Sequence, residues 1–317
     1  MQPIFGTSVR VCNVCGHHHR QRLAFRHRDR PLHHGVRYLV CAAGPARTGA
    51  ITPFLCLSQL VISDEAEIVI GGWFVSEMMV LPRDSGEAAE WILERRLEYW
   101  SLPGQRTPVC AVVPTGFEAY CRLFHPALRV SNGHAVEVRW GNIASELGAE
   151  LQGDTAWGDL ASGDAAFSGL WHQAPRTGSL SQKEVTALVD LLRPSTSTGE
   201  ECIFAVWDGY GGSELDRQWP GAARLRLPGR TYVLLKGPIE AATVSYDVPE
   251  PGLPTFDQSP NIWWPSDVAW CVATDIDLCW TYVGASRRCI DQIIADRGLE
   301  ALEVHANDPV PDLPIGG

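Results

Sequence analysis

The spacing of three short apolar segments restricts the fold more than any other feature of this sequence. Cys202–Trp207, residues 222–227 and residues 231–236 each have the length and pattern of a buried or half-buried strand. All three lie within 35 residues, and a Pro-Gly turn at residues 228–229 separates the last two. The spacing therefore predicts an antiparallel meander in this part of the chain.

Helix signals separate the predicted strands. Ser181 and Glu184 form a capping box, Pro194 is the stop, and one helix face between them is apolar: Val185, Leu188, Val189 and Leu192. Ser286 predicts the start of a last helix through Ala295, with Gly298 as its C-cap glycine. Three further helices are predicted over residues 87–99 after Ser85, over 117–124 behind a capping box of Thr115 and Glu118, and over 142–147.

The remaining segments complete the expected fold. Further strands are predicted at residues 36–41, 67–75, 109–113, 136–140 and 270–274, and a long loop is predicted at 149–180. Strands and about five helices alternate irregularly, and no repeat of about 20 to 50 residues is visible. We therefore expect an α+β fold, mixed, with a largely antiparallel sheet.

The first fifty residues differ from the rest of the chain. These residues, which we call the head, hold eight Arg and one acid, Asp29, so their formal charge is +7. Since the whole chain has a formal charge of −11, residues 51–317 have one of −18. The head shows neither helical nor strand periodicity, so we expect residues 1–50 to be a basic, poorly ordered or mis-started extension. Residues 51–305 are expected to form one α+β body, or two halves at 51–195 and 200–305, with residues 306–317 as a tail.

Composition excludes several classes of protein. No apolar run approaches the roughly 18 residues of a membrane-spanning helix, and no secretory signal is recognisable, which predicts a soluble, cytoplasmic protein. The ten Cys are scattered, which favours reduced, buried thiols over a disulfide framework. The acidic body argues against a general nucleic-acid surface. Partners are otherwise unknown.

A pair of cysteines in the head gives the sharpest local chemistry. Cys12 and Cys15 have the spacing of two zinc ligands, and His33 or His34 with Cys41 could complete a tetrahedral site. The alternative is an unstructured extension without a metal, because a second C-x-x-C is missing. Zinc is the one cofactor that the sequence suggests.

Two strand ends carry carboxylates. Asp275 and Asp277 follow an apolar strand, and this arrangement resembles the nucleophile and acid of haloacid-dehalogenase-type phosphotransferases, although only forty residues remain after Asp277. The alternative is a pair of solvated or capping carboxylates. Asp208 and Tyr210 lie in a glycine-rich turn after residues 202–207, so they are candidates for catalysis and ligand binding, respectively, beside the simpler role of a turn.

His125 and a tryptophan cluster are the remaining candidates. His125 follows the helix predicted over residues 117–124, where it would either cap the helix or act as a general base. Trp263 and Trp264 could stack on a sugar or base, or could simply belong to the core.

Four segments look like one group of proteins. Their sequences and their order along the chain resemble those of hypothetical proteins from high-GC actinobacteria. The four segments are residues 114–126 (PTGFEAYCRLFHP), 204–211 (FAVWDGYG), 227–238 (LPGRTYVLLKGP) and 261–270 (NIWWPSDVAW). The resemblance covers residues 109–304 and implies a folded body, but it implies no activity, ligand or catalytic residue.

The sequence leaves two functional hypotheses. The first is a non-catalytic ligand- or protein-binding module, because no nucleophile motif, phosphate loop or complete metal site is present. The alternative is a hydrolase-like enzyme that uses His125, Asp208 or the Asp275 and Asp277 pair in a cleft.

Overall fold

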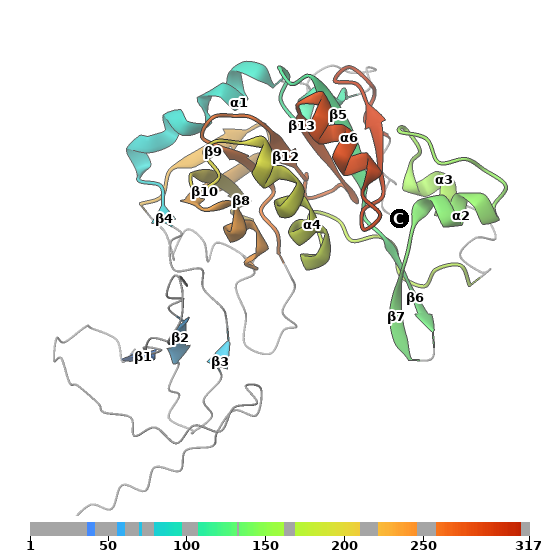
Figure 1. Cartoon of the computed structure of the whole chain (residues 1–317), viewed down its shortest axis with the longest axis horizontal. Coiled ribbons are helices and arrows are strands. Elements are labelled where there is room, and N and C mark those ends of the chain that lie inside the picture. The colour runs from blue at the N-terminus through green and yellow to red at the C-terminus, as the bar shows by residue number, and fades with distance from the viewer. Residues whose placement is uncertain are drawn as a thin grey trace, which may run out of the picture.

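The computed structural model describes residues 37–41, 56–60, 70–71, 79–96, 107–131, 133–161, 169–209, 221–245 and 258–311 (Figure 1). Its strands are β1 Arg37–Cys41, β2 Cys56–Leu60, β3 Ile70–Gly71, β4 Met79–Val80, β5 Ala119–Phe124, β6 Ala127–Ser131, β7 His134–Val138, β8 Cys202–Trp207, β9 Arg224–Leu227, β10 Arg230–Gly237, β11 Ile262–Pro265, β12 Cys271–Ala273, β13 Trp280–Ala285 and β14 Ala301–Val304. Its α-helices are α1 Glu90–Arg95, α2 Trp140–Glu146, α3 Trp157–Ala161, α4 Gln182–Leu192 and α6 Arg287–Ala295. Its 3-10 helices are η1 Arg83–Ala89, η2 Val109–Ala111, η4 Arg193–Ser195 and η5 Ile239–Thr243.

One large sheet organises the molecule. Nine strands lie in the order β14-β5-β13-β12-β11-β8-β10-β4, with β9 also paired to β10. Every pairing in this sheet is antiparallel. Together with the α-helices of the described residues, this confirms an α+β fold with a largely antiparallel sheet. The predicted meander is wrong in its order, because β10 lies between β8 and β9.

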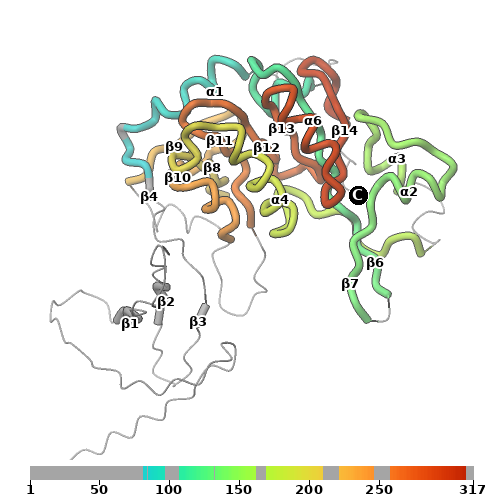
Figure 2. Tube along the Cα trace, viewed as in Figure 1, coloured from blue at the N-terminus to red at the C-terminus, as the bar shows by residue number. Residues whose placement is uncertain are grey.

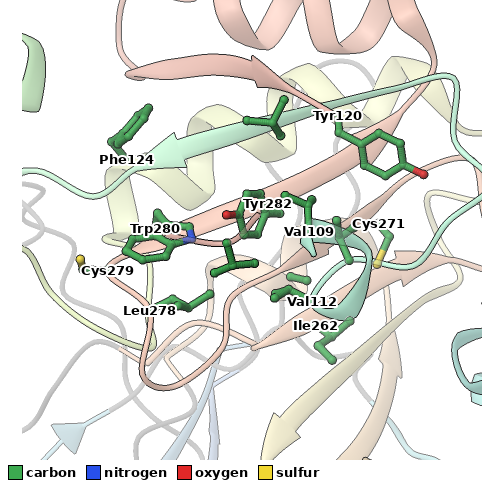
Figure 3. Packing of buried hydrophobic residues seen from close by; sticks show 14 of the residues in the cluster. Val109, Val112, Tyr120, Phe124, Ile262, Cys271, Leu278, Cys279, Trp280 and Tyr282 are labelled. Atoms are coloured by element: carbon green, nitrogen blue, oxygen red, sulfur yellow. The ribbon is translucent and has the colours of Figure 1, made fainter. Parts of the chain in front are cut away.

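Helices cover the sheet on both faces. On the side that we call the α4 side, Leu188 of α4 and Ile290 of α6 pack in one cluster with Phe204 of β8. On the other side, which we call the Trp140 side, Ile92 of α1 and Trp140 of α2 belong to a second cluster. Figure 3 shows a part of this cluster that includes Trp280 and Tyr282 of β13. The trace in Figure 2 shows α1 and the α4–α6 pair over different parts of the sheet. Both clusters combine residues from before and after residue 200.

The helix predicted over residues 117–124 is instead a central strand, β5. Cys121 packs in the cluster on the α4 side and Phe124 in the cluster on the Trp140 side, and β13 and β14 pair with its two edges. The predicted capping box has other partners: Thr115 donates its hydroxyl to the Arg95 carbonyl at 2.9 Å, and the Glu118 carboxylate accepts from the Arg287 N–H at 2.9 Å. Tertiary contacts therefore override the local helix signal.

Two other predicted elements change type or limits. Residues 109–113 form no strand; Val109–Ala111 is a 3-10 helix, because a short apolar run does not distinguish a strand from a buried helical turn. Its backbone is held by the chain after β14, where Asp308 and Ala306 accept from Val109 and Cys110. Ser85 does not cap the first helix: it lies inside η1 with non-helical angles, and α1 ends at Arg95. Residues 306–311, expected to be part of a tail, thus pack on the body.

The strongest local signals are confirmed. Ser181 and Glu184 form both bonds of the capping box at the start of α4, and the Ser286 hydroxyl accepts from the Cys289 N–H at the start of α6. Gly298 is not a C-cap glycine, because α6 ends at Asp296 in an extended conformation. The expected loop at 149–180 contains the short helix α3. The strand predicted over 67–75 falls mostly outside the described residues, apart from β3.

Two smaller sheets complete the architecture. Strands β1, β2 and β3 pair with one another, and β6 and β7 form a hairpin that extends away from the main sheet in Figure 1. Within the described part of the chain, no helix has the length and apolar content needed to cross a bilayer.

Candidate functional site

Three of the predicted catalytic residues lie at the same end of the main sheet, just beyond the C-terminal ends of three of its strands. Antiparallel pairing places the ends of β5, β8 and β12 beside the starts of β13, β10 and β11. His125, Asp208 and Asp275 follow directly after those three strand ends or within two residues of them. Side chains of successive strand residues point to opposite faces, so residues at neighbouring strand ends do not necessarily meet in one site.

His125 lies on the α4 side within a chain of buried hydrogen bonds. Its Nδ1 is 2.7 Å from the Arg176 carbonyl oxygen, and its Nε2 is 2.9 Å from the Thr281 hydroxyl. Since a carbonyl can only accept, Nδ1 carries the proton and Nε2 accepts from Thr281. The Thr281 hydroxyl lies 2.6 Å from that of Thr274. His125 follows a strand rather than a helix, so it does not cap a helix as expected.

Asn261 continues this chain to the next strand. Its side-chain oxygen accepts from the Trp207 N–H at 2.9 Å, and its amide donates to the carbonyls of Gly178 and Thr274 at 3.2 and 3.3 Å. We call the four residues His125, Thr281, Thr274 and Asn261 the His125 row. The row holds the segment 176–178 against the sheet just before α4 begins.

Burial sets the protonation of His125. The side chain is 1 % exposed, and burial lowers the pKa of His125 below its ordinary value of 6.5, while nearby Glu184 and the bond to Arg176 oppose this shift. Arg176 and Arg122 add to this lowering through their positive charges. The imidazole is therefore neutral at pH 7, and it is fully engaged in hydrogen bonds.

Asp275 and Asp277 share one arginine. Arg230 forms an ion pair with Asp277 and lies 3.6 Å from the Asp275 carboxylate. Asp275 is 7 % exposed, whereas Asp277 is 52 % exposed. Arg96, at the end of α1, is affected by both Asp275 and Arg230; burial lowers its pKa, and Asp275 opposes that shift. The structure therefore brings the two carboxylates together with two arginines, away from the polar contacts of His125.

The other candidates have separate positions. Asp208 continues β8, where its N–H donates to the Thr231 carbonyl at 3.0 Å, and Tyr210 lies outside the described residues. Trp263 and Trp264 are buried on opposite faces: Trp263 packs against Trp270, and Trp264 packs against Trp91. These two tryptophans therefore belong to the core and present no stacking surface. The hydrolase-like site stays a prediction.

The zinc prediction falls largely outside the structure. Cys12, Cys15 and His33 are not among the described residues, and Cys41 is the last residue of β1. No group of three or more potential metal ligands occurs in the part of the chain that the structure describes. The zinc site also stays a prediction.

A buried arginine on the Trp140 side was not predicted. Arg122 is 0 % exposed, and its guanidinium carbon lies 4.0, 4.5 and 5.4 Å from the ring centroids of Trp280, Phe124 and Trp140. Nη1 donates to the carbonyls of Gly153 and Thr155 at 2.9 and 2.8 Å. Burial lowers the pKa of Arg122 to about 10, so the group remains charged at neutral pH. We call Arg122, its three ring partners and Tyr282 the Arg122 centre.

Several polar atoms of the Arg122 centre are unpaired. Within the described residues, Nε and Nη2 of Arg122 are buried without a hydrogen-bond partner, whereas the Trp280 indole nitrogen and the Tyr282 hydroxyl have each other as their polar neighbour. Tyr282 lies directly across from Arg122 in the sheet register, and Figure 3 shows its hydroxyl beside the Trp280 indole. Cation–π contacts thus replace a carboxylate as the surroundings of this charge.

Most residues of the β6–β7 hairpin are exposed. Val130 and Val136 are 49 % and 42 % exposed, and they lie on opposite faces of the ribbon because Val130 pairs with Ala135 and Val136 with Arg129. Gly133, with φ of +79°, lies in the connection between the strands. Ser131 and His134 pair directly, which fits a two-residue hairpin turn.

The two edges of this hairpin differ. Along the outer edge of β6, Leu128 bonds to the backbone of Gln173, and the Val130 N–H donates to the His172 ring at 2.9 Å. Leu128 and Val130 therefore direct their backbone groups away from β7. In an antiparallel pair, the residues directly opposite them also direct their backbone groups outward. Those residues are Ala135 and Glu137 of β7. Among the described residues, no strand pairs with this outer edge of β7.

A polar cavity lies at the base of the hairpin. It measures about 320 Å³, and β7 borders it through Glu137 and Val138, while α2 borders it through Asn142, Ser145 and Glu146. Glu137 also forms an ion pair with Lys183 at the start of α4, at 2.5 Å. An open strand edge, exposed valines and a cavity therefore occur together at one end of the molecule.

None of the candidate residues predicted from the sequence lies on this hairpin. The Asn132-Gly133 dipeptide between two short alternating segments is a strong hairpin signal and could have located it. The open edge could not have been found, because it depends on the long-range contact of β6 with residues 172–173.

Comparisons with protein-family models, with curated proteins and with solved structures find no match to this chain. The similarity to the actinobacterial group therefore stays a prediction.

Proposed function

We propose that this chain is a non-catalytic protein-binding module that binds an extended strand of a partner along the outer edge of β7. The observation that carries the proposal is the open edge itself, since Ala135 and Glu137 direct their backbone donors and acceptors to solvent on a projecting hairpin. Addition of a strand to such an edge is a recurring mode of recognition, in which main-chain hydrogen bonds supply affinity.

The exposed side chains support this mode. Val136 of β7 offers an apolar contact on one face of the ribbon, and on the other face Ala135 lies between the added strand and Val130 of β6. Natural proteins usually protect exposed strand edges with charge, proline or covering elements. Glu137 is the one charged residue among the five of β7.

We place this activity in the cytoplasm. Six cysteines, Cys110, Cys121, Cys202, Cys271, Cys279 and Cys289, are free and buried, which suits a reducing compartment. Fractionation of cells that express the full chain would test this location.

The test uses a library of random linear peptides displayed on phage and the full-length protein as bait. Ala135→Pro removes an outward N–H that no hairpin bond uses, whereas the matched control Ala135→Val keeps that N–H. We expect selected peptides to bind wild type and A135V, and to bind A135P at least about tenfold more weakly. Peptides that bind A135P as well as wild type, or a selection without any binder, would overturn the proposal.

A further inference from the structure

The outer edge of β7 is complementary to itself. If β7 meets an antiparallel copy with the twofold axis at Val136, Ala135 lies opposite Glu137 of the second copy, and Glu137 opposite its Ala135. Both are outward-facing residues, so each pair exchanges two backbone hydrogen bonds. This register satisfies every outward backbone group of Ala135 and Glu137 in both copies.

We infer that β7 pairs with β7 of a second copy of this chain, so that two β6–β7 hairpins form one four-stranded antiparallel sheet. This inference rests on the proposed function and names the partner at the same edge. A closed twofold contact uses the same surface on both copies, which leaves no edge of β7 open for a third chain.

The side chains fit this register. The two Val136 side chains meet at the axis as a non-hydrogen-bonded pair, where cross-strand side chains are closest. On the same face, Arg129 of each copy lies next to its own Val136 and therefore on the far side from the other Arg129. On the opposite face, Glu137 lies beside Ala135 of the second copy. No like charges lie directly opposite each other.

The cavity at the base gives the second copy a further contact. In this register, His134 of one copy lies opposite Val138 of the other, and Val138 lines the cavity together with Asn142 and Glu146. His134 and Val138 also share the ribbon face of Val136, because alternate residues of a strand point the same way. The cavity is lined by two carboxylates, Glu137 and Glu146, and one guanidinium, Arg129, so its net charge is negative. An imidazole complements this polar cavity, which favours a second copy over an unrelated apolar strand.

The contact is small, and this determines its strength. A five-residue edge buries less than the roughly 1,000 Å² expected of a stable interface, so association should be weak and should depend on protein concentration.

The first experiment is disulfide trapping with the full-length protein under mild oxidation. Val136→Cys places two thiols across the axis within disulfide reach, whereas Ala135→Cys places them on diagonal positions beyond it. We expect V136C to give at least about fivefold more covalent dimer than A135C, and wild type sets the background from native cysteines. Equal trapping in V136C and A135C would overturn the register.

The second experiment measures association by sedimentation velocity over a wide range of concentration. We expect wild type and Ala135→Val to show a concentration-dependent dimer, and Ala135→Pro to remain monomeric with unchanged thermal unfolding. A wild-type protein that stays monomeric at all concentrations, or a dimer unaffected in A135P, would overturn the inference. If the protein stays monomeric and phage peptides still require the Ala135 N–H, the inference fails while the proposed function stands.

Discussion

Two buried polar clusters on opposite faces of the same sheet are built in different ways. The His125 row, on the α4 side, pairs its donors with acceptors from strand to strand. The Arg122 centre, on the Trp140 side, buries a charge among aromatic rings and leaves donors unpaired. The burial is similar, at 1 % exposure for His125 and 0 % for Arg122, so burial alone does not determine what each residue contributes.

The difference shows what each cluster does for the fold. Removing a member of the His125 row leaves a buried polar group without its hydrogen bond, and stability then falls by the full desolvation free energy of that group. Replacing Arg122 by an apolar residue leaves two carbonyls without their donor, which lowers stability. It also removes a buried charge that has no carboxylate partner, which raises stability. Substitutions on the two sides of the sheet should therefore change the free energy of unfolding by different amounts, and even in opposite directions.

Asn261→Leu should have the largest effect. It removes one bond from each of three buried backbone groups, on Trp207, Gly178 and Thr274. We expect a loss of about 3 to 5 kcal/mol in the free energy of unfolding, measured in urea. Asn142→Leu, at an exposed position, is the control and should change stability by less than about 0.5 kcal/mol. Equal effects of the two substitutions would contradict the role of the row.

His125→Leu should follow, with a loss of about 2 to 4 kcal/mol, because the Arg176 carbonyl and the Thr281 hydroxyl each lose their hydrogen bond to the imidazole. A double-mutant cycle with Thr281→Val measures the coupling directly, and we expect about 1 kcal/mol. Strictly additive losses would show that the hydrogen bond between the two side chains contributes nothing.

Arg122→Met tests the opposite face. An apolar side chain of similar volume keeps the contact with the rings and removes the buried charge, so stability should change by less than about 1 kcal/mol or increase. Arg122→Ala is the matched control, and it should cost about 2 to 4 kcal/mol because it leaves a cavity. A loss in R122M as large as that in R122A would mean that the charge itself stabilises the fold.

The pH dependence of stability should give the smallest effect. Since the folded pKa of His125 lies below 6.5, the unfolded chain takes up the proton first as the pH falls. Stability should therefore decline from about pH 6.5 downward and level off below the folded pKa. The difference between wild type and H125L isolates this contribution, and identical pH profiles would contradict it.

The parts of the fold that could be predicted are those specified by neighbouring residues. Ser181 and Glu184 lie three residues apart and form their capping box within one turn, so the start of α4 is readable. Thr115 and Glu118 have the same spacing but bind Arg95 and Arg287, 20 and 169 residues away. Nothing local distinguishes the two pairs, and only the pairing of β5 with β13 and β14 decides between helix and strand.

The candidate site shows the same division. The turn of the β6–β7 hairpin is visible in the sequence, but the exposure of its outer edge depends on residues 172–173, more than thirty positions away in sequence. His125 was identified as a residue of interest for a local reason, its predicted place after a helix. Its actual partners lie 51 and 156 residues further along the chain.

The position of β5 in the sheet determines the order in which the protein can form during synthesis. Both neighbours of β5, β13 and β14, belong to the last part of the chain, so β5 leaves the ribosome long before either exists. Its side chains are apolar toward both faces apart from Arg122, and an unpaired strand of this kind is prone to aggregate. The main sheet can therefore be complete only after translation of Val304, so β5 must stay soluble without either neighbour until then.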